Sequence, residues 1–388
     1  MTGFVGWDIG GAHLKASLLE TGSGPARLRT AIVPFEIWRD PGALAARLRG
    51  LRGDPGATCA VTMTAELSDV FPDRASGVRA VIEACTAAFG SGIAARDAAS
   101  FRVLAIDGRL IDPPQAAEDP ARVVAANWVA TARLAAAVLP AGVVIDVGST
   151  TTDLIPFAAG SPCPRSRTDT ARLASGELVY TGLLRTPAAA IAAAVPLRGG
   201  WCRVAPEQFA ISADVHRILG TIDDEDYTPP TPDGRGRDPE ACAARLARLV
   251  CADARDLGPD AIRGMAVFLQ DRQIDVIARA LHQVLSGAEF SGSRETVICG
   301  VGAFLAAAAA ERCGLRAARL ADRLESVVAD AGPFPGLEGG SVSRAPRARA
   351  WDEAAPSAAL AILLAVEAGA IRLPSADASE KPGAVPRR

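Results

Sequence analysis

An internal repeat of a short glycine-containing hairpin constrains this sequence more than any other feature. Residues 4–20 consist of an apolar run, the turn DIGG and a second, mixed run. Residues 142–157 repeat this design around the turn DVGS. Aligning the two segments pairs Asp8 with Asp146, Gly10 with Gly148 and Lys15 with Asp153. The repeat predicts a duplicated fold in which two related lobes each open on a β-hairpin.

The chain length agrees with two lobes. At 388 residues, the sequence exceeds what one hydrophobic core usually serves. We expect a first lobe over residues 1–140 and a second over 141–373. A long alanine-rich helix is expected over 120–138. The segment 374–388 has almost no large apolar residue, so we expect a disordered tail there.

Composition and charge exclude several classes of protein. A formal net charge of -3 gives no electrostatic reason to expect nucleic acid as a partner. Asp8, His13 and Lys15 interrupt any secretory signal, and the apolar stretch 358–366 is too short to cross a bilayer. The eight cysteines form no CxxC pair, so neither a zinc site nor a disulfide framework is expected. We expect a cytoplasmic protein without a membrane partner, for which a homo-oligomer remains open.

The first hairpin has the elements of an anion cradle. Gly10 and Gly11 allow backbone N–H groups to approach phosphate oxygens, Lys15 can neutralise their charge, and Asp8 can organise a hydrated Mg²⁺. Of 41 basic residues only two are lysines, which favours a need for a compact ammonium at Lys15. A Gly-Gly hairpin is more often only a turn. His13 is equally suited to phosphate and to a bond with the backbone.

The second hairpin strengthens this interpretation. Four consecutive hydroxyl residues, Ser149 to Thr152, separate the carboxylates of Asp146 and Asp153. Hydroxyls suit phosphate oxygens and carboxylates suit Mg²⁺ or a proton, although a threonine-rich strand also forms for local reasons. Asp8 and Asp146 are the expected metal ligands. The residues assigned to phosphate or diphosphate binding are Gly10, Gly11, His13, Lys15, Gly148, Ser149, Thr150 and Thr151.

A third glycine-containing element lies late in the chain. The run Val297 to Ala303 predicts a strand, a turn at Gly300 and Gly302, and the start of a helix. Exposed amides at such a turn can cover a nucleotide or another anion. Close packing of a helix on a strand explains the same glycines equally well.

In this order, the three elements resemble the phosphate-1, phosphate-2 and adenosine motifs of the actin, sugar kinase and heat-shock chaperone superfamily. The resemblance implies an α/β, two-lobed, actin-like ATPase (ribonuclease H-like) fold with a duplicated βββαβαβα core and an interlobe cleft. Residues 6–15, 146–156 and 175–187 (SGELVYTGLLRTP) more narrowly resemble the hydantoinase/oxoprolinase-related proteins of tetrahydromethanopterin-linked one-carbon metabolism. That likeness extends up to the helix that follows Gly300.

This narrower resemblance implies a specific reaction. It implies a transferase that condenses an aminomethylfuran-methyl diphosphate with the phenol of a glutamyl-tyramine or tyrosine acceptor and releases pyrophosphate, in methanofuran or methylofuran biosynthesis. Ionisation of the diphosphate would leave a furfuryl-type cation, which the phenol oxygen captures. Mg²⁺ is the implied cofactor, and ATP is an alternative ligand that this interpretation does not require.

Residue roles follow from the implied reaction. Lys15 and a metal held by Asp8 and Asp146 would stabilise the departing pyrophosphate. Either Asp153 or Glu177 would accept the phenolic proton. For Glu177, a role at a helix start or on the surface is an equal alternative.

Tyr180 and Arg185 are the candidates for orienting the substrate. Each has a plain alternative, because Tyr180 can be a packed aromatic side chain and Arg185 a solvated arginine. Two other functions also fit the cradle: an ATP-dependent kinase or hydantoinase-type hydrolase, and a nucleotide-binding actin-like scaffold without turnover.

Overall fold

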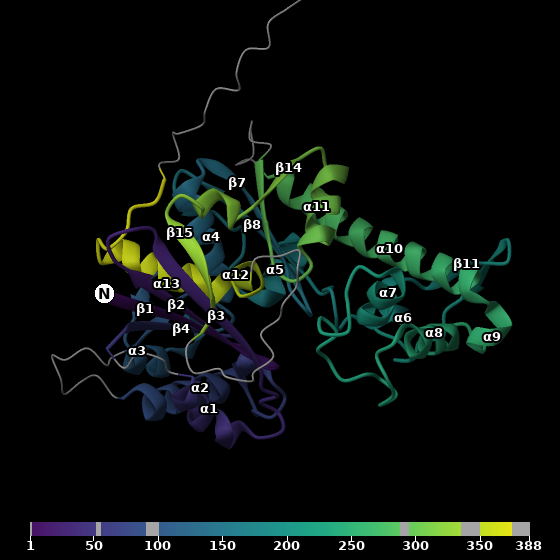
Figure 1. The fold of residues 1–388 in the computed structure, drawn as a ribbon, viewed down its shortest axis with the longest axis horizontal. Coiled ribbons are helices and arrows are strands. Elements are labelled where there is room, and N and C mark those ends of the chain that lie inside the picture. The colour runs from purple at the N-terminus through teal and green to yellow at the C-terminus, as the bar shows by residue number, and fades with distance from the viewer. Residues whose placement is uncertain (1, 52–55, 91–100, 288–294, 335–349, 375–388) are drawn as a thin grey trace, which may run out of the picture.

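The computed structural model describes residues 2–51, 56–90, 101–287, 295–334 and 350–374. The tail expected to be disordered lies outside these residues, apart from Pro374. Two β-sheets dominate the fold, and helices lie on both sides of each and between them (Figure 1). Within the described part of the chain, no helix is both long and apolar enough to cross a membrane.

The first sheet has seven strands in the order β15-β3-β2-β1-β4-β5-β6. Strands β1 to β3 form an antiparallel meander, and β4 and β5 then run parallel to β1. The strands are β1 (Thr2–Ile9), β2 (His13–Thr21), β3 (Ala26–Pro34), β4 (Thr58–Met63), β5 (Phe101–Leu104), β6 (Leu110–Ile111) and β15 (Val328–Pro333).

The second sheet repeats this plan. Its order is β10-β8-β7-β13-β14, with β9 also paired to β8. Strands β7 and β8 are antiparallel, whereas β13 and β14 run parallel to β7. The strands are β7 (Ala141–Val147), β8 (Thr152–Ala158), β9 (Ser161–Pro162), β10 (Leu178–Val179), β13 (Glu295–Cys299) and β14 (Arg316–Arg319). The predicted duplication is therefore confirmed at the level of strand order and direction.

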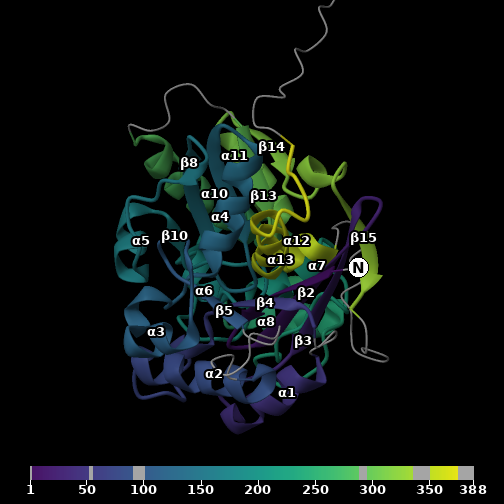
Figure 2. The same ribbon diagram turned by 90° about the vertical axis from the view of Figure 1, so that its left-hand side faces the viewer.

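Helices complete a layered arrangement (Figure 2). Apolar side chains of α1 (Leu44–Gly50), α2 (Arg74–Phe89) and α3 (Pro113–Glu118) pack on the outer face of the first sheet. Those of α10 (Pro259–Leu285) and α11 (Ala303–Arg312) pack on the outer face of the second. Between the sheets lie α4 (Asn127–Val138) and α13 (Ala355–Glu367), which share one core with both.

The last part of the chain corrects the expected lobe boundary. The second sheet begins at Ala141, where the second lobe was expected, but residues 141–373 do not form one lobe. Strand β15 pairs with β3 of the first sheet, and α13 packs directly on β1. The approach is so close that a Cβ atom at Gly6 would overlap the carbonyl of Ser357. Strand β15 and helix α13 therefore complete the first lobe.

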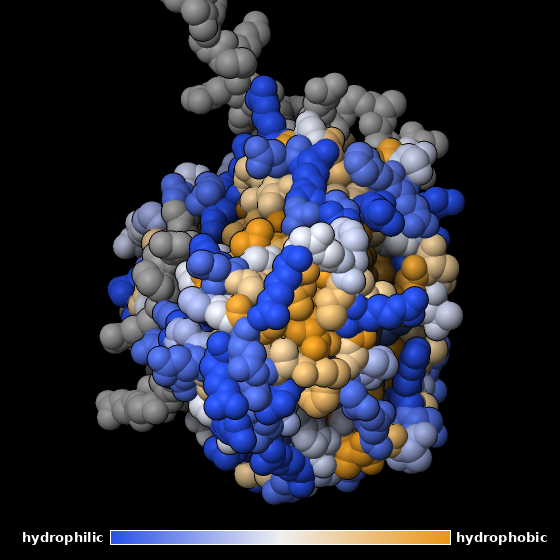
Figure 3. Space-filling view, turned by 90° about the vertical axis from the view of Figure 1, so that its right-hand side faces the viewer, coloured by the Kyte–Doolittle hydropathy of each residue, from blue (hydrophilic) through white to orange (hydrophobic). Residues whose placement is uncertain are grey.

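A smaller helical subdomain is inserted between β10 and α10, and it packs with the first half of α10 around a separate apolar core. Figure 3 shows the face of the molecule on this side, where hydrophobic residues gather at the centre and hydrophilic residues surround them. Its elements are α6 (Ala188–Ile191), β11 (Ala194–Leu197), β12 (Gly200–Arg203), α7 (Ser212–Leu219), α8 (Pro239–Arg248) and α9 (Ala254–Leu257); two further short helices outside it are α5 (Asp169–Ser175) and α12 (Ala350–Glu353).

Candidate active site

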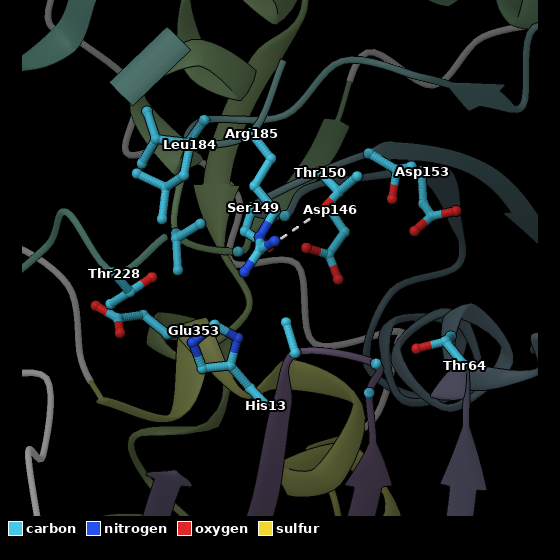
Figure 4. Close-up of a pocket in the computed structure, with 18 of the residues that line it drawn as sticks. His13, Thr64, Asp146, Ser149, Thr150, Asp153, Leu184, Arg185, Thr228 and Glu353 are labelled. Atoms are coloured by element: carbon cyan, nitrogen blue, oxygen red, sulfur yellow. Dashed lines mark hydrogen bonds between the residues drawn. The ribbon is translucent and has the colours of Figure 1, made fainter. Parts of the chain in front are cut away.

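The two repeated hairpins close with the same turn and face one cleft. In the first, the Gly10 N–H donates to the His13 carbonyl at 3.0 Å; in the second, the Gly148 N–H donates to the Thr151 carbonyl at 2.9 Å. Both turns line a cavity of about 1110 Å³ between the sheets. Figure 4 shows His13 reaching into this cavity from one side and Ser149, Thr150 and Asp146 from the other.

On the first hairpin, Asp8 and Lys15 lie opposite each other on β1 and β2. The Lys15 ammonium is 3.3 Å from one carboxylate oxygen of Asp8, and the other oxygen is buried without a hydrogen-bond partner. Burial alone lowers the pKa of Lys15, but the charges of Asp8 and Asp146 outweigh it and raise the pKa. Burial, Lys15 and Arg185 lower the pKa of His13 to about 4. Lys15 is therefore the cation of this hairpin, and His13 is neutral at pH 7.

On the second hairpin, Asp146 and Asp153 occupy the equivalent pair of positions. Burial, followed by the neighbouring charge of Asp153, raises the pKa of Asp146 to about 7. Asp153 instead accepts a hydrogen bond of 2.7 Å from Arg172, whose guanidinium is buried over the Trp128 ring. Where the first hairpin has a cation, the second has a carboxylate held by a buried arginine.

The segment after β10 supports the second hairpin. The N–H groups of Leu183 and Arg185 donate to the carbonyls of Gly148 and Ser149. Gly182 makes this contact possible, because a Cβ atom there would lie 2.5 Å from the Thr150 backbone. The segment thus holds the turn in place and carries Arg185 into the cleft.

The late glycine turn also meets the second hairpin. The Gly302 N–H donates to the Val147 carbonyl at 2.9 Å, and Gly300 lines the cleft with a left-handed φ of 85°. A side chain at either glycine would overlap Val147. The close-packing explanation therefore holds for both glycines, while Gly300 also faces the cleft beside Asp146.

Glu177 is not where a catalytic base must be. Its carboxylate is fully buried and accepts hydrogen bonds from the N–H groups of Arg165 and Ser166 and from the Ser175 hydroxyl. It does not line the cleft. The expected catalytic role is corrected to a structural one, since both oxygens are used to fix the loop before α5. Tyr180 lines the cleft but lies at its rim, with 70% of its surface exposed.

Three candidate functional residues are not indicated by the sequence. Arg172, Glu66 and Arg217 stand in no recognisable motif, and only the fold brings them to the cleft or its wall. Glu66 is 1% exposed; one oxygen accepts the Ala125 N–H at 2.7 Å and the other has no partner. Burial raises its pKa to about 7. In the sequence, the one signal for Glu66 is that a carboxyl residue follows shortly after the end of an apolar strand.

The donor set suits a magnesium ion that a substrate phosphate helps to bind. No cluster of three or more potential ligand side chains exists among the described residues. Mg²⁺ does not need one, because it is usually held by one or two carboxylates together with water and phosphate oxygens. Asp8, with its unpartnered buried oxygen, and Asp146 both line the cleft and can supply those carboxylates.

Two sheets that share the order of five strands, around a cleft with paired hairpins, define an actin-like, two-lobed fold. In agreement, the chain is similar to acetone carboxylase in its nucleotide-free structure, with a TM-score of 0.51 and 12% identity over 80% of this chain and 67% of that one. Residues 57–332 match the hydantoinase/oxoprolinase family, and the chain belongs to it.

Two curated relatives share a single name. A protein of Methanocaldococcus jannaschii is 32% identical over 77% of this chain and 86% of its own length. A protein of Methanococcus vannielii is 33% identical over 41% of this chain and 70% of its own length. Both are (4-{4-[2-(γ-L-glutamylamino)ethyl]phenoxymethyl}furan-2-yl)methanamine synthases.

Proposed function

We propose that this protein is a transferase that forms an aryl alkyl ether. The substrates are an aminomethylfuran-methyl diphosphate and a phenol that carries a glutamyl group, and the products are the phenoxymethylfuran and pyrophosphate. The observation that carries the proposal is the pair of facing hairpins, with Lys15 paired to Asp8 and within the influence of the Asp146 charge, in a chain similar to the M. jannaschii synthase over most of both lengths.

The chemistry requires a site that stabilises a departing diphosphate. The methylene C–O bond breaks and its electron pair leaves with pyrophosphate, so negative charge grows on the leaving group. Lys15 and the amides of the two turns would receive this charge. Mg²⁺, held by Asp8 and Asp146, would add positive charge at the same place.

The second half of the reaction forms the ether bond. A lone pair of the phenol oxygen attacks the methylene carbon of the furfuryl cation, and the phenolic proton leaves. We assign the proton to Asp153, which lines the cleft, in place of Glu177. Arg172 would keep the Asp153 carboxylate aimed at the cleft. We place the reaction in methanofuran or methylofuran biosynthesis and the protein in the cytoplasm.

The proposal is tested by combining purified protein, Mg²⁺, the furan diphosphate and γ-glutamyltyramine. Phosphorus NMR should detect pyrophosphate, and mass spectrometry should detect the coupled product in equal amount. Lys15→Arg is the matched variant, because it keeps the charge but not the compact ammonium, and its rate should fall. Absence of coupling, together with ADP formation from ATP, would replace the proposal with an ATP-dependent kinase or hydrolase.

A further inference from the structure

Two of the four arginines that line the cleft have no carboxylate partner. Arg172 and Arg319 pair with Asp153 and Asp352. By contrast, Arg185 and Arg217 make no ion pair with any described residue, although the Nε–H of each, like that of Arg172, is buried without an acceptor. A guanidinium that lines a cleft without a carboxylate partner is suited to bind a planar anion.

A rigid frame aims Arg217 at the cleft. Its helix, α7, is anchored one turn earlier, where buried Asp214 accepts hydrogen bonds from Tyr227 and Arg245. The neighbouring His216 meets Gln273 at 3.0 Å. Arg217 is thus presented by a helix whose orientation is fixed by buried polar contacts.

The same set of hydrogen bonds also holds the segment that carries Arg185. Gln273 donates to the carbonyl of Gly182, and so does Ser212 at the start of α7. The two unpaired arginines therefore belong to one hydrogen-bonded unit of the second lobe. Arg185 lies near His13, whose pKa its charge lowers, whereas the Arg217 carbonyl accepts the N–H of Gly220, the first of several cleft-lining residues between 220 and 228.

Carboxylates accompany Arg217 at this end of the cleft. Asp223 and Asp226, in the loop after α7, line the cavity. One oxygen of each accepts backbone N–H groups within the loop. Neither is within 4 Å of a described cation. The cavity is thus lined here by a guanidinium and by carboxylates that form no ion pair with a described residue, whereas Lys15 of the first hairpin is the cation available to a diphosphate.

We infer that Arg217 and Asp226 form a subsite for the free α-amino acid end of the phenolic acceptor. The inference rests on the proposed function. A γ-linked glutamyl group keeps both its α-carboxylate and its α-ammonium, which match a guanidinium and a carboxylate respectively. Arg217 binds the carboxylate, Asp226 binds the ammonium, and the phenol points toward the hairpins.

Calorimetric titration of the free protein tests the subsite without turnover. Wild type, Arg217→Ala and Arg255→Ala are each titrated with γ-glutamyltyramine, tyramine and pyrophosphate. Arg255 is the matched control, because its side chain is 84% exposed and lies outside the cleft. Arg217→Ala should weaken γ-glutamyltyramine binding by roughly 10- to 100-fold and leave tyramine and pyrophosphate binding unchanged.

An analogue separates the two halves of the subsite. N-glutaryltyramine keeps the terminal carboxylate but lacks the α-amino group. Wild type should prefer γ-glutamyltyramine over this analogue, and Asp226→Asn should lose that preference while Arg217→Ala weakens both ligands.

The outcomes distinguish this inference from the proposed function. Arg217-dependent binding of γ-glutamyltyramine without ether formation supports the subsite and refutes the transferase. Ether formation with an unchanged kcat/KM in Arg217→Ala refutes the subsite and supports the transferase. Loss of pyrophosphate binding in Arg217→Ala would assign this arginine to the diphosphate, and absence of acceptor binding by wild type would also overturn the subsite.

Discussion

The two hairpins of this protein share a backbone and differ in chemistry. Their turn hydrogen bonds agree to within 0.1 Å, at 3.0 and 2.9 Å, and their strands pair in the same register. Yet Lys15 stands in the first lobe where Asp153 stands in the second. The duplicated hairpins thus keep the same turn, while their side chains place a lysine in one and a second carboxylate in the other.

The supports of the two hairpins differ as well. Beside the first, the Thr64 N–H donates to Ile9 at the end of β1, and the adjoining Glu66 fixes Ala125. Beside the second, Thr186 and Ser212 bind the segment that carries Gly182 through neutral hydrogen bonds. One support depends on an ionisable group and the other does not.

The largest effect is expected when the lysine that distinguishes the first hairpin from the second is removed. Lys15→Ala should lower kcat of the proposed reaction by roughly 10²- to 10³-fold, because a cation aimed at the leaving group is lost. Steady-state release of pyrophosphate measures it. Since Asp8 also loses its ion-pair partner, the double variant Asp8→Asn/Lys15→Met serves as a neutral pair for comparison of thermal unfolding. Wild-type kcat in Lys15→Ala would contradict the role of the first hairpin.

The second-largest effect concerns the pH dependence of stability that comes from Glu66, the ionisable residue beside the first hairpin. The pKa of Glu66 is raised from 4.5 to about 7 in the folded protein, so the folded state binds the proton more tightly than the unfolded state. The contribution of Glu66 protonation to the free energy of unfolding is therefore full below pH 4.5 and is lost as the pH rises to about 7. It amounts to about 3 kcal/mol.

Glu66→Gln should abolish this part of the pH dependence, because an amide does not titrate in this range. Urea unfolding at pH 5 and pH 8 measures the difference for both proteins. Equal slopes of stability against pH in wild type and variant would show that Glu66 keeps an ordinary pKa.

The smallest effect concerns the neutral support. Gly182→Ala should lower the free energy of unfolding by about 2 kcal/mol, because its Cβ would press on the Thr150 backbone. Gly11→Ala is the matched change in the first hairpin, where a Cβ atom meets nothing within 4 Å. Thermal unfolding of both variants makes the comparison, and equal stabilities would refute the bracing role of Gly182.

Local chemistry explains which features the sequence could predict. The hairpins were predictable because glycine, carboxylate and apolar positions lie within a few residues of one another. The prediction of Glu177 as a base is wrong because two of its three partners are backbone N–H groups, which no side-chain pattern reveals. The helix expected over 120–138 begins only at Asn127, since Ala125 adopts a left-handed φ of 48°. Arg217 became a candidate only when tertiary structure brought α7 to the cleft.

The return of the chain to its first sheet has a consequence for folding during synthesis. Strand β15 and helix α13 complete the N-terminal lobe, and α13 covers β1 at Gly6. While the ribosome is still translating the second lobe, the first therefore keeps an unpaired β3 edge and an uncovered apolar face, both of which favour aggregation. The nascent N-terminal lobe is accordingly a predicted client of chaperones until residues 328–367 emerge.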